Sequence, residues 1–248
     1  LWAANAFRLN RDPAYDINNY LNTNNILTAN VRADSGQPDG WRDYQQVLSE
    51  LGLIISTRIH REITLTPLGK AYLEETFSYS EMMTLQALRY QFPNGHRTTI
   101  SRTLRRELAG TSFSSIPTLT ELQIQTGVRI RPAVLTWKVL RQLTQLNPTS
   151  ALTTAEVEAF LVPCISHNDT HLVVQTIINS RQQNLPLPKA SRQTQEWVRF
   201  LLMTPLFSRP GQGMITISDF GHRASSDIDG ICNRLEELET FWMPRSTN

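Results

Sequence analysis

The chain has 248 residues, a net charge of +2 and 40% hydrophobic residues. This length allows one large domain or two smaller ones, each with its own hydrophobic core, and we expect two. No apolar run approaches the roughly 20 residues that a membrane span requires, so we expect a soluble protein without a membrane partner. Only Cys164 and Cys232 are present, and they form no CxxC pair, which favours a reducing, cytoplasmic compartment. Because the first residue is Leu1, the chain can be a piece of a longer protein.

The basic residues have an unusual composition, because only 3 of the 24 are lysines. Arginine offers a planar set of donors that suits phosphates and guanine edges. Residues 85–145 hold nine basic and two acidic residues, whereas the stretch 219–239 is mainly acidic. This uneven distribution predicts one face that attracts a polyanion and one that does not.

The first predicted unit has the order helix, hairpin, helix. Asp39 can cap a helix over WRDYQQVLSELG, which Gly52 ends. Residues 53–55 and 62–66 are predicted as two strands around a polar turn, and Pro67-Leu68-Gly69 leads into a further helix.

A linking segment follows. The stretch SYSEMMTLQALRYQF predicts a helix that ends at the turn-forming residues 92–95. We therefore predict a first unit at 1–92, an Arg-rich connector at 93–128 and a second unit at 129–248.

The second unit repeats the pattern of the first. Pro132 opens a helix, Thr153 or Thr154 can cap the next, and residues 171–183 predict a third. Ser191 then caps RQTQEWVRFLLM, and residues 206–207 and 214–218 are predicted as a hairpin. The endings ITLTPLG (63–69) and ITISDFG (215–221) correspond at an offset of 152 residues. A helix followed by a hairpin is typical of a winged helix, so the predicted fold is mainly α with short β-hairpins, arranged as tandem winged-helix units.

The outward faces of the two helices that precede the hairpins have the chemistry of groove-reading surfaces. Arginine can make a bidentate contact to guanine, and glutamine to adenine. A solvated polar helix face is the alternative for either helix alone, but the same character in both copies favours DNA. The candidate residues are Arg42, Gln45, Gln46 and Ser49 in the first unit, and Arg192, Gln193, Gln195 and Arg199 in the second, where Glu196 shares the face.

The predicted hairpins and the connector add further cations. Cations on a wing usually meet phosphates, which position a protein on DNA without reading its sequence. The connector can act as a phosphate clamp or be a solvated linker helix. These residues are Arg58, His60, Arg61 and Arg209 on the hairpins, and Arg97, Arg102, Arg105 and Arg106 in the connector.

The sequence contains no complete motif of the catalytic families considered. A PD-(D/E)xK nuclease needs an acidic residue two positions before a lysine, to help hold Mg²⁺, but Leu68, Thr136 and Leu187 occupy these positions. There is no G-x-S-x-G, no phosphate-binding Gly-rich loop and no dinucleotide fingerprint. Cys164, His167 and His171 have the spacing C-x2-H-x3-H, but no fourth zinc ligand is apparent, so a capped loop is the simpler interpretation.

Several segments together resemble a known family. LSELGLI, ITLTPLG, LRYQFPNG, RIRPAVLTWKVLRQL and LTTAEVEAFL, in this order within residues 41–161, resemble the DNA-recognition regions of type IIS restriction and nicking endonucleases of the AlwI and BpuJI kind. The resemblance implies tandem winged-helix subdomains that read an asymmetric site, with a separate PD-(D/E)xK domain that cuts DNA. The groove-reading helix of the family would correspond to Arg42, Gln45, Gln46 and Ser49.

We therefore expect sequence-specific binding of double-stranded DNA by the recognition domain of a restriction endonuclease. No cofactor is expected in this chain, and Mg²⁺ would belong to a nuclease domain fused elsewhere or to a partner. A non-cleaving winged-helix regulator or defence sensor, and a winged-helix scaffold for protein interactions, are the alternatives. A docking scaffold should expose Leu, Phe or Trp where a DNA reader exposes Arg and Gln.

Overall fold

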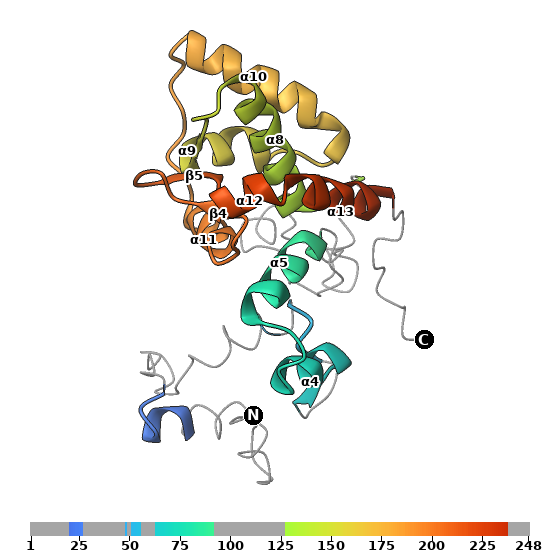
Figure 1. Ribbon diagram of the computed structural model, residues 1–248. Coiled ribbons are helices and arrows are strands. Elements are labelled where there is room, and N and C mark those ends of the chain that lie inside the picture. The colour runs from blue at the N-terminus through green and yellow to red at the C-terminus, as the bar shows by residue number, and fades with distance from the viewer. Residues whose placement is uncertain (1–19, 27–47, 49–50, 56–62, 92–126, 238–248) are drawn as a thin grey trace, which may run out of the picture. The chain divides into compact units, whose positions relative to one another are not determined.

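The structure is a computed structural model that describes residues 20–26, 48, 51–55, 63–91 and 127–237 (Figure 1). The chain divides into two compact units, Leu1–Met82 and Met83–Asn248. Within the described ranges, no helix is long and apolar enough to cross a membrane.

The first unit contains the predicted hairpin and the helix that follows it. Strands β1 (Ile54–Ile55) and β2 (Thr64–Leu65) pair antiparallel, with Ile54 opposite Leu65. Helix α4 (Pro67–Leu73) follows, and Gly52 has a φ of 70°, which suits a glycine at the end of a helix. Most of the predicted helix before Gly52 lies outside the described residues.

Helix α5 (Tyr79–Arg89) is the predicted linking helix. Its start is fixed by reciprocal bonds: the Ser78 N–H donates to Glu81, and the Glu81 N–H donates to the Ser78 hydroxyl. The division between the two units falls within this helix, between Met82 and Met83. Residues 92–126 are outside the described ranges, so the predicted division into 1–92, 93–128 and 129–248 stays a prediction.

The second unit is built around helix α8 (Pro132–Leu146). Trp137 and Leu140 are fully buried in its centre, and α10 (Thr170–Gln182) packs along the helix (Figure 1). A three-stranded antiparallel sheet also contacts α8, with the order β3 (Leu152–Thr153), β5 (Met214–Ile217), β4 (Phe207–Ser208). Ile215 and Ile217 of β5 alternate with less buried neighbours, as expected for a strand with one face on the core.

Five helical elements lie between β3 and β4. The first, α9 (Thr154–Glu156), begins with a capping box on Thr153, so the structure selects Thr153 from the two predicted caps. It continues as the π-helix η2 (Val157–Leu161). After η3 (His167–Asp169) come α10 (Thr170–Gln182) and α11 (Arg192–Leu201), and Ser191 caps α11 as predicted.

The chain beyond the hairpin differs from the predicted elements. The strand predicted over residues 214–218 is followed directly by helix α12 (Asp219–Arg223), because the Ser218 hydroxyl caps the Gly221 N–H. Helix α13 (Ser225–Glu237) follows and buries Ile228 and Cys232. No helix was predicted here.

The two hairpins end in the same corner, which gives the internal repeat a structural basis. The Thr66 hydroxyl accepts a hydrogen bond from the Gly69 N–H and donates one to the Gly52 carbonyl. The backbone N–H of Thr66 donates to the Leu53 carbonyl. The Ser218 hydroxyl likewise accepts a hydrogen bond from the Gly221 N–H and donates one to the Pro205 carbonyl. The backbone N–H of Ser218 donates to the Leu206 carbonyl. We call this arrangement the hydroxyl corner. Each corner closes its hairpin at the base and starts the next helix.

The described chain is mainly α-helical with short antiparallel hairpins, which confirms the predicted fold class. In the second unit, strand β3, the α9–η2 segment, helices α10 and α11 and the β4–β5 hairpin follow one another, and the first strand pairs with the last. This order is winged-helix-like, and it places α11 directly before the β4–β5 hairpin.

Candidate nucleic-acid interface

Helix α11 is anchored to the core by one face. Thr194, Val198 and Leu201 are buried, and they recur at the three- and four-residue spacing of a helical face. The ring centroid of Trp197 lies 5.7 Å from the ring centroid of Tyr90 and 5.3 Å from that of Phe200. This packing fixes which side of the helix faces solvent.

The start of α11 is held by a carboxylate from η2. Oε2 of Glu158 accepts the Ser191 N–H at 2.9 Å and the Thr194 hydroxyl at 2.5 Å. These bonds, first the one from Thr194, lower the pKa of Glu158, because they stabilise the ionised form. Sequence reasoning did not find Glu158, since its partners lie more than 30 positions away.

The exposed side of α11 carries a row of polar residues that we call the α11 stripe. Its members share one helix face and are all exposed: Arg192, Gln193, Glu196 and Arg199. Glu196 Oε1 lies 3.0 Å from Nη1 of Arg199 and 4.0 Å from Nε of Arg192. The stripe therefore presents a carboxylate between two guanidinium groups.

Gln195 differs from the outward position expected for it. The side chain is half-buried, and its Nε2 donates to the Ala190 carbonyl at 3.1 Å. Gln195 thus contacts the backbone just before α11 begins, and a DNA contact by this residue stays a prediction.

The hairpin beside α11 presents Arg209 in its turn. Arg209 is exposed and follows β4 directly, and Gly213 closes the turn with a φ of 67°. Two bonds tie this hairpin to the chain around β3: the Thr154 N–H donates to Gly213 at 2.8 Å, and the Thr216 hydroxyl donates to Ser150 at 2.7 Å. The turn is therefore carried on an anchored base, as a wing that contacts a phosphate backbone would be.

The candidates of the first unit and of the connector cannot be placed in this way. The residues predicted there to bind DNA lie outside the described ranges: Arg42, Gln45, Gln46, Ser49, Arg58, His60, Arg61, Arg97, Arg102, Arg105 and Arg106.

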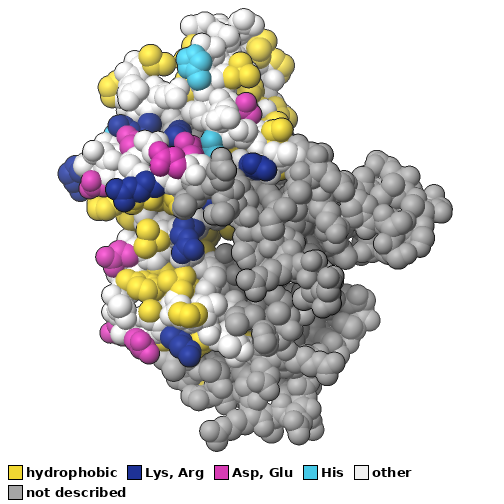
Figure 2. All heavy atoms as spheres, turned by 90° about the vertical axis from the view of Figure 1, so that its right-hand side faces the viewer, with side chains coloured by type: hydrophobic (Ala, Val, Ile, Leu, Met, Phe, Trp, Pro, Cys, Tyr) yellow, Lys and Arg dark blue, Asp and Glu magenta, His cyan; other side chains and the backbone are white. Residues whose placement is uncertain are grey.

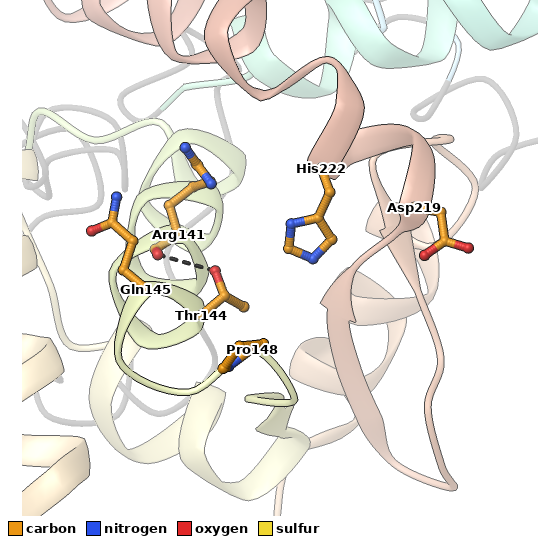
Figure 3. A pocket seen from close by; sticks show the side chains of 6 residues that line it. All are labelled: Arg141, Thr144, Gln145, Pro148, Asp219 and His222. Carbon is orange, nitrogen blue, oxygen red and sulfur yellow. Dashed lines mark hydrogen bonds between the residues drawn. The ribbon is translucent and has the colours of Figure 1, made fainter.

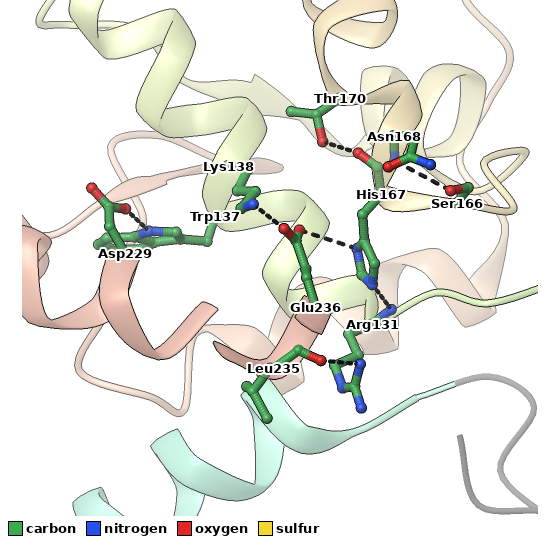
Figure 4. Close-up of polar contacts among 10 residues, drawn as sticks. All are labelled: Arg131, Trp137, Lys138, Ser166, His167, Asn168, Thr170, Asp229, Leu235 and Glu236. Atoms are coloured by element: carbon green, nitrogen blue, oxygen red, sulfur yellow. Dashed lines mark hydrogen bonds and ion pairs between the residues drawn. The ribbon is translucent and has the colours of Figure 1, made fainter. Parts of the chain in front are cut away.

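The segment with the zinc-like spacing is occupied by other interactions. Nε2 of His167 accepts the Arg131 N–H at 3.2 Å (Figure 4). Cys164 Sγ donates to the Phe160 carbonyl at 3.0 Å. Burial, with a smaller contribution from Asp169, raises the pKa of Cys164 to about 11, which disfavours the thiolate that a metal binds. In the part of the chain that the structure describes, no group of three or more His, Cys, Asp and Glu is placed to hold a metal ion.

His167 instead belongs to a partly buried network that joins α8 to α13. Glu236 forms an ion pair with Lys138, and its Oε1 lies 3.7 Å from His167 Nδ1 (Figure 4). Burial lowers the pKa of His167, although Glu236 acts in the opposite direction. Because Nε2 accepts a hydrogen bond, the neutral ring carries its proton on Nδ1 and directs it towards Glu236.

A second contact between α8 and α13 centres on Asp229. Its carboxylate accepts hydrogen bonds from Nε1 of Trp137 at 2.7 Å and from Nη2 of Arg141 at 3.1 Å. Figure 2 shows acidic and basic side chains interleaved on one face of the molecule. Helix α13 itself exposes both signs, with Asp227, Arg234 and Glu237 all exposed. Mixed signs give no strong attraction for a polyanion, so α13 is a poorer candidate for a DNA surface than the α11 stripe with its hairpin.

A shallow pocket of about 420 Å³ lies between α8 and α12. Its polar groups do not converge on a ligand: Thr144 donates to the Arg141 carbonyl, and the Arg141 guanidinium is bound to Asp229. In Figure 3 the His222 ring extends towards α8, whereas the Asp219 carboxylate lies on its far side. The residues that line the pocket are Arg141, Thr144, Gln145, Pro148, Asp219 and His222.

Comparison with known proteins finds similarity in the fold. No protein-family profile matches the chain, and no curated protein sequence does. Among solved structures, the chain is similar to the BpuJ1 endonuclease binding domain, crystallised in complex with pyrene- and phenanthrene-modified DNA. The TM-score is 0.63 at 15% sequence identity, and the match covers 97% of this chain and 82% of that chain. The likeness therefore concerns nearly the whole described architecture.

Proposed function

We propose that the chain binds double-stranded DNA in a sequence-specific way, with α11 in a groove and the β4–β5 hairpin on the phosphate backbone. The observation that carries this proposal is the α11 stripe, which exposes arginine and glutamine on a helix firmly fixed to the core, beside a hairpin with an exposed Arg209. Arginine and glutamine side chains suit base edges, and a cation on a wing suits phosphate. The similar fold of a binding domain crystallised with DNA supports the same conclusion.

We further propose that this binding belongs to a restriction endonuclease of the type IIS kind, acting in the cytoplasm. Cleavage would then be supplied by a nuclease domain outside these residues. The chain itself lacks the PD-(D/E)xK pattern, because no acidic residue stands two positions before any lysine, and we derive no metal-dependent step from it.

A titration of labelled duplex at two salt concentrations tests the proposal. Contacts from arginine to phosphate release counterions, so the affinity should fall steeply as salt rises. The double variant Arg192→Ala, Arg199→Ala should lose discrimination between duplexes selected from a random pool and unselected ones. Retention of no duplex, or an affinity that hardly responds to salt, would contradict DNA binding.

Partner docking is a second candidate, because the second unit also exposes large hydrophobic side chains. Leu172 in the first turn of α10 is 63% exposed, and Val162 at the end of η2 is 57% exposed. An exposed apolar patch can mark a protein interface. The variant Leu172→Gln distinguishes the two functions, since it should leave duplex affinity unchanged if α11 and the hairpin contact the DNA.

A further inference from the structure

The α11 stripe contains a residue that phosphate binding does not explain. Glu196 lies between Arg192 and Arg199, and its side chain is 51% exposed. A carboxylate on a surface that meets DNA is repelled by every phosphate nearby. Its presence there needs a reason other than general attraction to a polyanion.

Helix stability does not supply that reason. Arg192 is the first residue of α11, where the helix dipole disfavours a cation, and the first turn contains no acidic residue. The pair Arg192 and Glu196 also has the less favourable order for residues four apart, with the cation on the N-terminal side. The closer pair, Glu196 and Arg199, has the favourable order, but its side chains are 51% and 62% exposed. Exposed ion pairs of this kind add little to stability, so the arrangement is better explained by recognition.

The chemistry of a carboxylate restricts what Glu196 can read. An ionised carboxylate only accepts hydrogen bonds. In the major groove, cytosine offers the N4 amino donor, whereas adenine combines its N6 donor with the N7 acceptor, which repels a carboxylate. Cytosine is therefore the base that Glu196 fits best.

The flanking arginines suit the guanines that accompany such a cytosine. Arg192 and Arg199 are seven residues apart, which is about 10.5 Å along a helix and spans roughly three base-pair steps. Guanine presents two acceptors to the major groove, which match a guanidinium. The stripe thus offers donors on both sides of a central acceptor.

We infer that Glu196 is a specificity-determining residue that accepts a hydrogen bond from cytosine N4 at one C·G pair of the target. This inference rests on the proposed function of α11 as the groove-reading helix. Glu196 lowers the affinity for DNA in general and raises the preference for one base pair, because specificity is a difference between affinities.

The substitution Glu196→Gln tests the inference with almost no change of shape. Wild-type protein and variant are each used to select duplexes from a random pool, and the affinity for every single-base-pair change in the selected site is then measured. We expect the wild-type site to contain a C·G pair whose replacement weakens binding about 5- to 150-fold. In Glu196→Gln that preference should be lost or move to A·T, because glutamine pairs with adenine, and affinity for unrelated duplex should rise. Glu196→Ala should lose the preference without gaining another.

A matched control is Glu237→Gln, which removes one exposed carboxylate at the end of α13, away from the stripe. It should leave the selected site unchanged. If Glu196→Gln selects the wild-type site with undiminished discrimination, or weakens all duplexes by one factor, Glu196 reads no base and only orients the arginines. If wild-type protein retains no duplex at all, the proposed function fails and the inference with it, which is a different result from retained binding with unaltered preference.

Discussion

Oε2 of Glu158 lies 2.5 Å from the hydroxyl of Thr194, and this contact joins η2 to the first turn of α11. The same oxygen accepts the N–H of Ser191, the residue that caps the helix. A single carboxylate from another element therefore positions the N-terminal end of the proposed groove-reading helix.

Removing the charge of Glu158 should loosen the start of α11. We expect Glu158→Gln to lower the free energy of unfolding by about 1 kcal/mol or less at neutral pH, because the hydrogen bonds to the carboxylate are partly screened by solvent. The pKa of Glu158 is lowered in the folded protein, so its contribution is present above the unfolded pKa and is lost as pH falls through the folded one. Urea titrations should show that the difference between wild type and variant narrows on acidification. A difference that grows at low pH would contradict this account.

The ion pair of Glu156 and Arg181 should contribute far more. Glu156 is buried, and Arg181 Nε lies 2.6 Å from its Oε1. We expect Arg181→Ala to lower the free energy of unfolding by about 3 kcal/mol, because it leaves a buried carboxylate without its cation. The double variant Arg181→Ala, Glu156→Gln should recover part of this loss in chemical denaturation. If the loss in the double variant equals the sum of the losses in the two single variants, the pair is not coupled.

The same pair predicts that the stability lost in Arg181→Ala depends on pH. Burial alone would raise the pKa of Glu156, but bonds from Arg181 and Thr153 outweigh it and lower the pKa. In wild type this contribution is present above the unfolded pKa and is lost as pH falls through the folded one. Without Arg181, burial dominates and the protonated carboxyl is favoured, so the deficit of Arg181→Ala should shrink on acidification. Unfolding curves of both proteins at several pH values measure this.

The glycines of the two hydroxyl corners should resist substitution. A Cβ on Gly221 would lie 2.5 Å from the Leu206 carbonyl oxygen and 2.8 Å from Ile217 Cγ2, and one on Gly69 would meet the Leu53 carbonyl. We expect Gly221→Ala to lower the free energy of unfolding by about 1–3 kcal/mol, since the strand or helix must shift. Gly230→Ala on α13 is the matched control, because its Cβ would meet nothing within 4 Å. It should stabilise the helix by about 0.5–1 kcal/mol, and thermal unfolding that ranks the two variants alike would refute the steric explanation.

Arg209 and the α11 stripe should differ in how they bind DNA. We expect Arg209→Ala to weaken selected and unselected duplexes about equally and to reduce the salt slope by about one unit, as the loss of a phosphate contact does. Arg192→Ala should instead weaken the selected site by about 1–3 kcal/mol and relax discrimination at one base pair. Titrations at several salt concentrations separate the two effects. Equal behaviour of the two variants would mean that the wrong element has been placed in the groove.

Local chemistry made much of the second unit predictable. The caps at Thr153 and Ser191 and the opening of α8 at Pro132 were visible in the letters, because each depends on residues within one helical turn. The offset of 152 residues between the two ITxTxxG-like endings led to two hairpins with the same corner.

Contacts between distant segments could not be predicted in this way. The anchoring of α11 by Glu158, and the use of His167 as an acceptor for the Arg131 N–H, depend on which helices pack together. The same holds for Asp229, which looked like one member of an acidic stretch but accepts the Trp137 and Arg141 donors of α8. A single sequence carries no local signal for such pairings.

The hydroxyl corners also separate the part of each hairpin that must be kept from the part that is free to vary. Thr66 bonds a carbonyl 14 residues before it and Ser218 one 13 residues before it, so the two closed loops already differ in length by one residue. Lengthening a loop whose ends are fixed costs little conformational entropy. The hairpin tips are therefore where insertions cost least, while the corners and the core behind them stay the same. If the hairpins contact DNA as proposed, changes at the tips can alter those contacts without unfolding the domain.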